Sequence, residues 1–211
     1  MSENPEQTET QTNASERIEP MLAHLKVGGQ NIDLDRIRAH FNQMWEFENG
    51  DNLSEEEQYL TTIGLFIYTC HNALDDYSIN VMRARQYITD ALTAWLAPET
   101  DKQVAEEKAS DNPFKTFVEK EQPRAEDYFS WRHFLLEVKK ASDKEFQFKM
   151  KSCWFHSLFI RLGRADYIET ACNFDRIPAE ARTDYVNLKL NNTFAKLGTF
   201  CQFRYTPSEG E

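Results

Sequence analysis

The spacing of apolar residues changes along this chain from a helical period to a strand period, and that change limits the folds open to it. In the first part, Ile37, Phe41, Met44 and Trp45 recur at helical spacing, which predicts a helix with one buried face. Residues 146–150 instead alternate apolar and polar side chains, which is typical of a strand with one buried face. Helices first and antiparallel strands last predict an α+β fold.

Capping residues and prolines predict where the helices begin and end. A helix is expected to begin near residues 31–33, and Ser54 with Glu57 forms an S-x-x-E capping box ahead of the next one. A third helix should stop near Ala97, because Pro98 follows it. These signals predict three helices in the first half of the chain.

The middle of the chain carries weaker signals. Residues 99–112 are charged and weakly apolar, so a linker or exposed loop is expected there. Pro123 suits the first position of a further helix, which we expect to carry apolar residues inward as far as Val138.

The last third combines strand and helix signals. Trp154 to Leu162 has helical spacing and ends at Gly163, a favourable helix C-terminal residue. From Tyr185 on, apolar and polar residues alternate. After a turn through 196–198, a second segment with the same alternation covers 200–205. These two segments predict a final β-hairpin, on whose sheet the helical N-terminal half should pack.

The domain boundaries follow from composition. Residues 1–20 contain five Glu against one Arg and few apolar side chains, so a disordered acidic tail is expected. Residues 21–206 should form one α+β domain, mainly helical over 21–145 and strand, helix and hairpin over 146–206. Residues 207–211 are expected to be loose.

The net charge excludes some classes of function. With 24 Lys and Arg against 35 Asp and Glu, the formal charge is −11, which disfavours nucleic acid and anionic membranes as partners. The first ten residues have neither the basic start nor the apolar stretch of a signal peptide. We therefore expect a cytoplasmic protein. With 7 Gly and no Gly-rich phosphate loop, no cofactor is expected.

Three of the four cysteines gather in the last sixty residues. Cys153 lies three positions before His156, Cys172 lies three before Asp175, and Cys201 lies on the predicted hairpin. One thiolate could be a nucleophile beside a histidine or a helix N-terminus, or the thiols and His156 could bind zinc. No C-x-x-C pair is present, so no metal site is predicted. The third interpretation is that these thiols are small core residues, as expected for Cys70 and its neighbour His71 on a core helix.

The motifs around these cysteines resemble a known family. The pattern C…C-x-x-D…T-x-x-x-x-G-x-x-C-x-F, with Asn112-Pro113-Phe114 upstream, resembles the L-2-amino-thiazoline-4-carboxylic acid hydrolase family over about residues 110–206. The same C-terminal strand is also similar, more distantly, to vinyl-reductase-type small-molecule-binding domains. The first resemblance implies a hydrolase, and the second implies a binding module that uses the same cysteine-lined pocket without catalysis.

The hydrolase resemblance implies that a cyclic amidine, 2-amino-thiazoline-4-carboxylate, is opened to a carbamoyl-cysteine. Under that hypothesis one carboxyl, one thiol and one imidazole would be catalytic, namely Asp175, Cys172 and His156. The residues that would bind the substrate are Cys153, Cys201, Arg204 and Lys189, with Arg204 suited to the substrate carboxylate. Gln202 stands where the family pattern has Asp, which leaves open whether this chain has a different substrate or lacks the hydrolase activity.

Overall fold

The computed structural model describes residues 13–208. Its helices, in chain order, are η1 (Ala14–Ile18), α1 (Glu19–Leu22), α2 (Leu34–Phe47), η2 (Gly50–Asn52), α3 (Glu55–Asp76), α4 (Val81–Lys108), α5 (Pro113–Tyr128), α6 (Trp131–Phe134), α7 (Trp154–Arg161), η3 (Ala165–Tyr167), α8 (Ile168–Phe174), α9 (Ile177–Glu180) and η4 (Phe194–Lys196). Its strands are β1 (Leu136–Ala141), β2 (Phe146–Met150), β3 (Val186–Asn191) and β4 (Cys201–Pro207).

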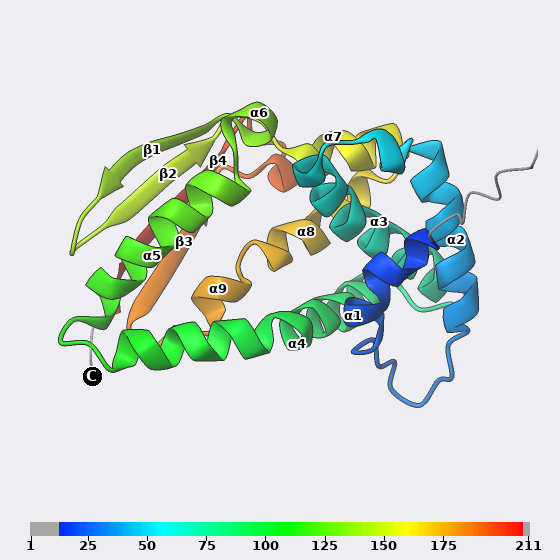
Figure 1. Ribbon diagram of the computed structural model, residues 1–211, viewed down its shortest axis with the longest axis horizontal. Coiled ribbons are helices and arrows are strands. Elements are labelled where there is room, and N and C mark those ends of the chain that lie inside the picture. The colour runs from blue at the N-terminus through cyan, green and yellow to red at the C-terminus, as the bar shows by residue number, and fades with distance from the viewer. Residues whose placement is uncertain (1–12, 209–211) are drawn as a thin grey trace, which may run out of the picture.

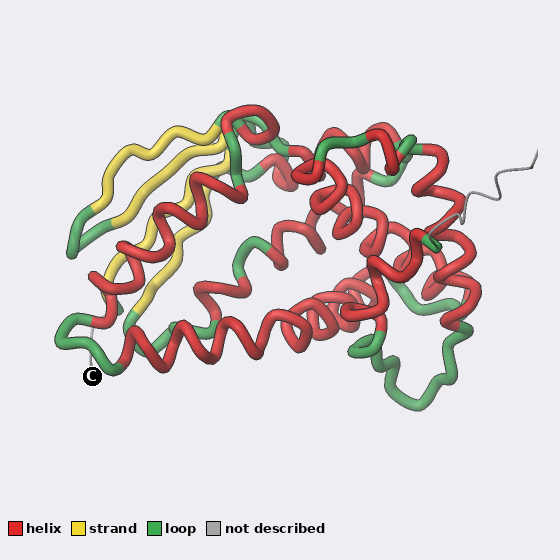
Figure 2. Tube along the Cα trace, viewed as in Figure 1, coloured by secondary structure: helices red, strands yellow, loops and turns green. Residues whose placement is uncertain are grey.

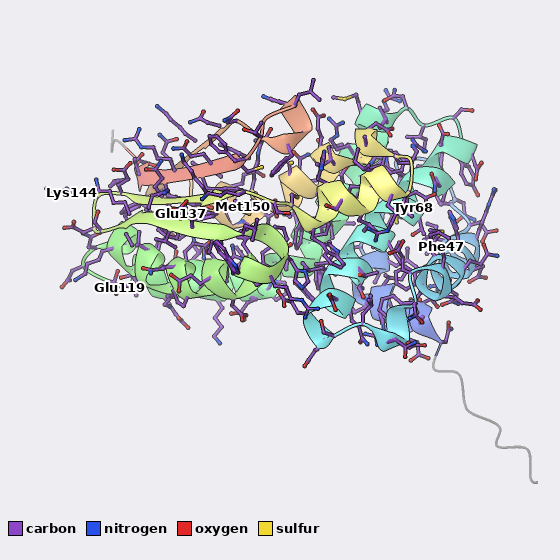
Figure 3. All side chains as sticks on the ribbon, turned by 90° about the horizontal axis from the view of Figure 1, so that it is seen from above. Phe47, Tyr68, Glu119, Glu137, Lys144 and Met150 are labelled. Atoms are coloured by element: carbon purple, nitrogen blue, oxygen red, sulfur yellow. The ribbon has the colours of Figure 1, made fainter. Side chains whose placement is uncertain are left out.

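The four strands form one antiparallel sheet in the order β1-β2-β4-β3. The sheet lies at one end of the molecule and the helices α1, α2, α3 and α7 at the other, while the long helix α4 connects the two ends (Figure 1, Figure 2). Lys144, in the β1–β2 turn, and Phe47, at the end of α2, accordingly lie toward opposite ends (Figure 3). The predicted α+β fold and the predicted hairpin of β3 with β4 are confirmed.

Helix α5 covers the inner face of the sheet (Figure 1). The ring of Phe129, just after α5, lies 5.7 Å from that of Phe148 on β2 and 5.8 Å from that of Phe203 on β4. Farther along, Phe117 lies 5.4 Å from Tyr205. The high phenylalanine content therefore serves this helix–sheet core, where large rings bury much apolar area for little side-chain entropy.

Helix α3 forms the centre of the helical end. It begins with the predicted capping box, in which the Ser54 hydroxyl accepts from the Glu57 N–H and Glu57 accepts from the Ser54 N–H. Cys70 and His71 on this helix are buried, as predicted. The His71 imidazole is satisfied, because its Nε2 lies 2.7 Å from the Thr170 hydroxyl.

Helix α4 continues through Pro98 to Lys108, so the predicted stop at Ala97 is wrong. The linker or loop predicted over residues 99–112 is wrong for 99–108 and is confined to residues 109–112, between α4 and α5. A proline inside a helix removes one backbone hydrogen bond, and tertiary contacts of the second half of α4 offset that loss. Glu107, in its last turn, is buried against Arg182. Although α4 has 28 residues, no helix within the described part of the chain is long and apolar enough to cross a membrane.

The segment between α4 and β2 also differs from expectation. Helix α5 begins at Pro113, where the Asn112 side chain caps it, and Pro123 lies inside the helix instead of starting it. Residues 136–141, of which 136–138 were expected in that helix, form the edge strand β1, which pairs with β2. Leu135, with a positive φ of 49°, turns the chain from the short helix α6 into β1.

The N-terminal segment is ordered over part of the expected tail. Residues 14–22 form η1 and α1, and Ile18 is fully buried in the core. The side chain of Arg38 forms an ion pair with Glu19 at 2.6 Å. The tail prediction is therefore wrong for residues 14–20, while residues 1–12 and 209–211 of the expected tails lie outside the described residues.

Candidate active site: a buried cluster of thiols and a carboxyl

Cys153 and Cys201 come to the interior from different elements. Cys153 is the N-cap residue of α7, and its side chain makes no capping hydrogen bond. Cys201 is the first residue of β4, and its sulfur accepts from the backbone N–H of Phe194 at 3.5 Å. Both side chains are buried, so residues 48 positions apart present their thiols to one interior region.

Cys172 and Asp175 lie at the end of helix α8. Their spacing of three residues places them on one side of that helix turn, and Asp175 is the C-cap residue. The Asp175 side chain is buried, and its Oδ1 atom has no hydrogen-bond partner. A buried carboxylate oxygen without a partner is unfavourable, and such an atom marks a place where a ligand or water can donate.

The charge on Asp175 acts on all three of these thiols, so the four groups form one cluster. Burial raises the pKa of the Cys201 thiol to about 11; the hydrogen bond from the Phe194 N–H opposes this shift, and the charge of Asp175 adds to it. Burial first, and Asp175 second, also raise the pKa of Cys172 and of Cys153 far above the usual range. All three thiols are therefore neutral near pH 7, and a nucleophilic role for any of them needs a base.

Asp175 has the properties of such a base. Burial raises the pKa of its carboxyl from 3.8 to about 7, while the guanidinium groups of Arg124 and Arg176 partly oppose the shift. A group whose pKa lies near the working pH is the most effective general acid or base. The cluster thus combines neutral thiols with one carboxyl able to take up or release a proton at neutral pH.

This shift has a measurable effect on stability. Folded Asp175 holds its proton up to about pH 7, whereas the unfolded residue loses it near 3.8, so the folded state binds more protons between these values. The free energy of unfolding should therefore fall as pH rises from about 4 to 7, by up to about 4 kcal/mol at 1.36 kcal/mol per pKa unit. Denaturant unfolding at pH 5 and pH 8 of the wild type and of Asp175→Asn measures it. A wild-type minus variant difference that is equal at the two pH values would contradict the assignment.

Arg204 and Lys189, expected to bind the substrate carboxylate, lie on the other face of the sheet. Side chains alternate along a strand, so the buried Cys201 faces the core while Arg204 and Lys189, which are paired in register, face outward. The Arg204 Nε donates to Glu145 at 2.6 Å. The structure therefore does not bring these two cations together with the thiols.

Arg204 and Lys189 instead line an open hollow of about 920 Å³ along β3. Arg176, which follows Asp175, also lines this hollow. None of the three thiols, and not Asp175, is among the residues that line this hollow.

The imidazole of His156 is at the margin of the cluster. It is half-buried, and its ring lies 5.4 Å from that of Phe194, the residue whose N–H donates to Cys201. No described contact joins its imidazole to Cys172 or Asp175. The geometry therefore favours Asp175 over His156 as the proton-transferring group.

Sequence reasoning missed Tyr128, at the end of α5. Its hydroxyl is buried without a hydrogen-bond partner, and burial first, then Asp175, raise its pKa well above the usual value. Arg124, one turn earlier, is held by Glu121 through bonds of 2.7 and 2.6 Å. These residues look like ordinary helix positions in the sequence, and only the fold brings them to the carboxyl.

Metal ligation has no support in the described chain. Within residues 13–208, no group of three or more His, Cys, Asp and Glu side chains is arranged to hold a metal ion. Two interpretations of the three thiols remain: they are reactive groups, or they are small side chains of the core.

The comparisons with known proteins bear directly on this cluster. The L-2-amino-thiazoline-4-carboxylic acid hydrolase family matches residues 65–205. The chain belongs to this family. The matched range contains the three thiols and Asp175, and it extends into α3 and α4, beyond the region of motif resemblance. Membership of this family suggests a hydrolase-like function.

Other comparisons add little. No curated protein matches the chain. The unliganded Fe(II) H-NOX protein from K. algicida is 8% identical with a TM-score of 0.40, covering 93% of this chain and 97% of its own. A mutant of that protein, also 8% identical, has a TM-score of 0.36 and covers 92% of this chain and 87% of its own. These TM-scores are too low for the likeness to carry an argument.

Proposed function

We propose that this protein hydrolyses a small cyclic amidine, such as 2-amino-thiazoline-4-carboxylate, to a carbamoyl-cysteine. The observation that carries the proposal is the buried Asp175 carboxyl with a pKa of about 7, three residues from the Cys172 thiol. Membership of the hydrolase family over residues 65–205 supports the choice of substrate.

The reaction adds one water molecule to C2 of the ring and breaks one ring bond at C2. In the proposed sequence, ionised Asp175 removes the proton from Cys172, and the resulting thiolate forms a bond to C2. Protonated Asp175 then gives that proton to the departing ring atom, and the C2–ring bond breaks. Water next attacks C2 and gives one proton to Asp175. The bond between C2 and the Cys172 sulfur then breaks, the sulfur takes that proton from Asp175, and the carbamoyl product forms.

The local environment suits this chemistry in two respects. The thiol pKa values are raised, so Cys172 stays protonated and unreactive until a base acts on it. The Asp175 carboxylate also offers a partner for the substrate amidinium, since charge-assisted hydrogen bonds are the strong kind. Binding of that cation would in turn favour the ionised carboxyl, which is the form needed for proton removal.

Turnover of L-2-amino-thiazoline-4-carboxylate tests the proposal directly. The wild type is expected to release carbamoyl-cysteine, and Cys172→Ala is expected to lose most of that activity because the covalent step is removed. Cys70→Ala, a buried thiol on α3 outside the cluster, is the matched control and should retain it. Absence of turnover by the wild type would reject the hydrolase, whereas equal turnover by Cys172→Ala would reject Cys172 as nucleophile.

A binding module without catalysis is the second candidate. The specific observation that favours it is that all three thiols of the cluster are neutral, so none of them is a nucleophile unless a base acts on it. Saturable binding of the substrate by the wild type, with no product released, would select this alternative.

A further inference from the structure

The open hollow of about 920 Å³ beside β3, here called the β3 hollow, follows the free edge of that strand. Within the described residues, β3 is the last strand of the sheet and pairs with β4 alone. Both faces of β3 contribute to the lining, Asn187 and Lys189 from the outer face and Leu188 and Leu190 from the inner face. The opposite wall comes from α9 and the residues around it, namely Arg176, Ala179, Glu180 and Thr183.

The free edge of β3 presents backbone groups that β4 does not use. The N–H of Ser208 donates to the carbonyl of Tyr185 at 3.2 Å, in the register that pairs β3 with β4. Bonded and non-bonded pairs alternate in an antiparallel ladder, so the odd-numbered residues of β3 bond to β4. The N–H and C=O groups of Leu188 and Leu190 therefore point into the hollow, and no described group outside the sheet bonds to them. Such an edge can accept a further strand.

The two edges of the sheet differ in how open they are to pairing. The pairing of β1 with β2 shifts in register between Val138 and Lys140, and such irregularities protect an edge. By contrast, β3 pairs with β4 over all six of its residues without a shift. Its inner-face side chains Leu188 and Leu190 are only half-buried, so an added strand would cover apolar surface as well as bond to the backbone.

The β3 hollow is cationic in a chain that is acidic overall. Arg176, Lys189 and Arg204 line it against one carboxylate, Glu180, whereas the formal charge of the chain is −11. Arg204 is bonded to Glu145, but Arg176 and Lys189 form no ion pair with a described residue. Charge complementarity therefore favours an extended segment that carries carboxylates.

Residues 6–12 of this chain have the composition of such a segment. Their sequence is EQTETQT, with two glutamates, no basic residue and no proline. Threonine stands at every second position, and β-branched residues suit a strand. Since side chains alternate along a strand, threonines on the face of Leu188 and Leu190 would place Glu9 on the face of Lys189.

The segment that fits this hollow must come from a second copy of the chain. Asn13 lies at the helical end, where its side chain accepts from Asn42 on α2 at 2.8 Å, and the sheet lies at the other end (Figure 1). Helix α4, which connects the two ends, has 28 residues and is about 42 Å long. Residues 6–12 directly precede Asn13 and span at most about 25 Å when extended, so they do not reach the hollow of their own molecule.

We propose that the β3 hollow binds residues 6–12 of a second copy as an added strand of the sheet. The backbone groups of Leu188 and Leu190 bond to this strand, and Lys189 faces Glu9. This inference goes beyond the proposed function and does not depend on it, because neither the thiols nor Asp175 line the hollow.

Light scattering of the full chain over a dilution series, at low salt and neutral pH, tests the proposal. The wild type should exceed the monomer mass at high concentration and return to it on dilution. Lys189→Glu and Glu9→Lys should each raise the dissociation constant about fivefold or more, because like charges then meet. The two changes together should restore association. Lys196→Glu, the same change at an exposed position of η4 outside the hollow, should associate like the wild type.

A proline variant tests the backbone pairing separately from charge. Thr10→Pro with Gln11→Pro removes consecutive N–H donors from the added strand, so association should be lost while the melting temperature stays that of the wild-type monomer. Asn4→Pro, ahead of the pairing segment, is the matched control and should associate normally.

Three results would overturn the proposal. One is a wild type that stays monomeric at every concentration, and another is a double charge variant that associates no better than the single ones. The third is association that survives the two prolines, which would show that the β3 edges of two copies pair with each other instead. Association is measured without turnover, so its failure and the failure of the hydrolase assay are separate results.

Discussion

Asp175→Asn is expected to lower the turnover of 2-amino-thiazoline-4-carboxylate by roughly 10²- to 10⁴-fold, the usual contribution of a general acid or base. The amide keeps the shape of the side chain but cannot accept the Cys172 proton. Steady-state kinetics on the purified variant measure the loss, which should fall mainly on kcat. The exposed Asp166, paired with Arg164 at 2.9 Å, supplies the control Asp166→Asn, which should keep full activity.

The same variant should unfold less readily than the wild type above pH 7. There the wild type carries a buried negative charge at position 175, whose burial is what raises its pKa to about 7, and the amide carries none. Loss of activity together with a gain in stability is the combination expected of a functional residue in an unfavourable environment. An active Asp175→Asn variant would contradict the mechanism, and an inactive but destabilised one would point to a structural role.

Glu107→Ala is expected to lower the free energy of unfolding by about 3–5 kcal/mol, because it leaves a buried guanidinium without its counter-charge. Arg182 is 2% exposed and donates to Glu107 at 2.6 and 2.9 Å. The Tyr185 hydroxyl also donates to Glu107 at 2.5 Å. Denaturant unfolding measures the effect.

A neighbouring ion pair gives the matched control. Lys108 and Asp184 are adjacent in sequence to the buried network, but their side chains are 48% and 57% exposed. Asp184→Asn should cost less than about 1 kcal/mol, as exposed pairs do. Replacing both buried partners, as Glu107→Leu with Arg182→Met, should recover much of the loss. A Glu107→Ala effect no larger than that of Asp184→Asn would show that the buried pair does not hold α4 to the rest of the chain.

The candidate site was only partly predictable from the sequence. The i, i+3 pair of Cys172 and Asp175 and the convergence of three thiols could be anticipated from motif spacing, and the structure brings these groups together. The cations Arg204 and Lys189 were placed by their position on the hairpin alone. Strand alternation then sends them to the face opposite Cys201, since neighbouring residues on a strand point to opposite sides.

Local patterns in the sequence were sufficient to determine the α+β class, the capped start of α3, the strand β2 and the hairpin of β3 with β4, because each depends on side chains near one another in the chain. The second half of α4 and the edge strand β1 were decided only by tertiary structure. The buried pair of Glu107 with Arg182 joins residues 75 positions apart and stabilises a helix across Pro98. Likewise β1 exists because β2 supplies its hydrogen-bond partners. Energies that depend on such distant partners are absent from any local pattern, so the environment of Asp175 is determined only in the folded chain.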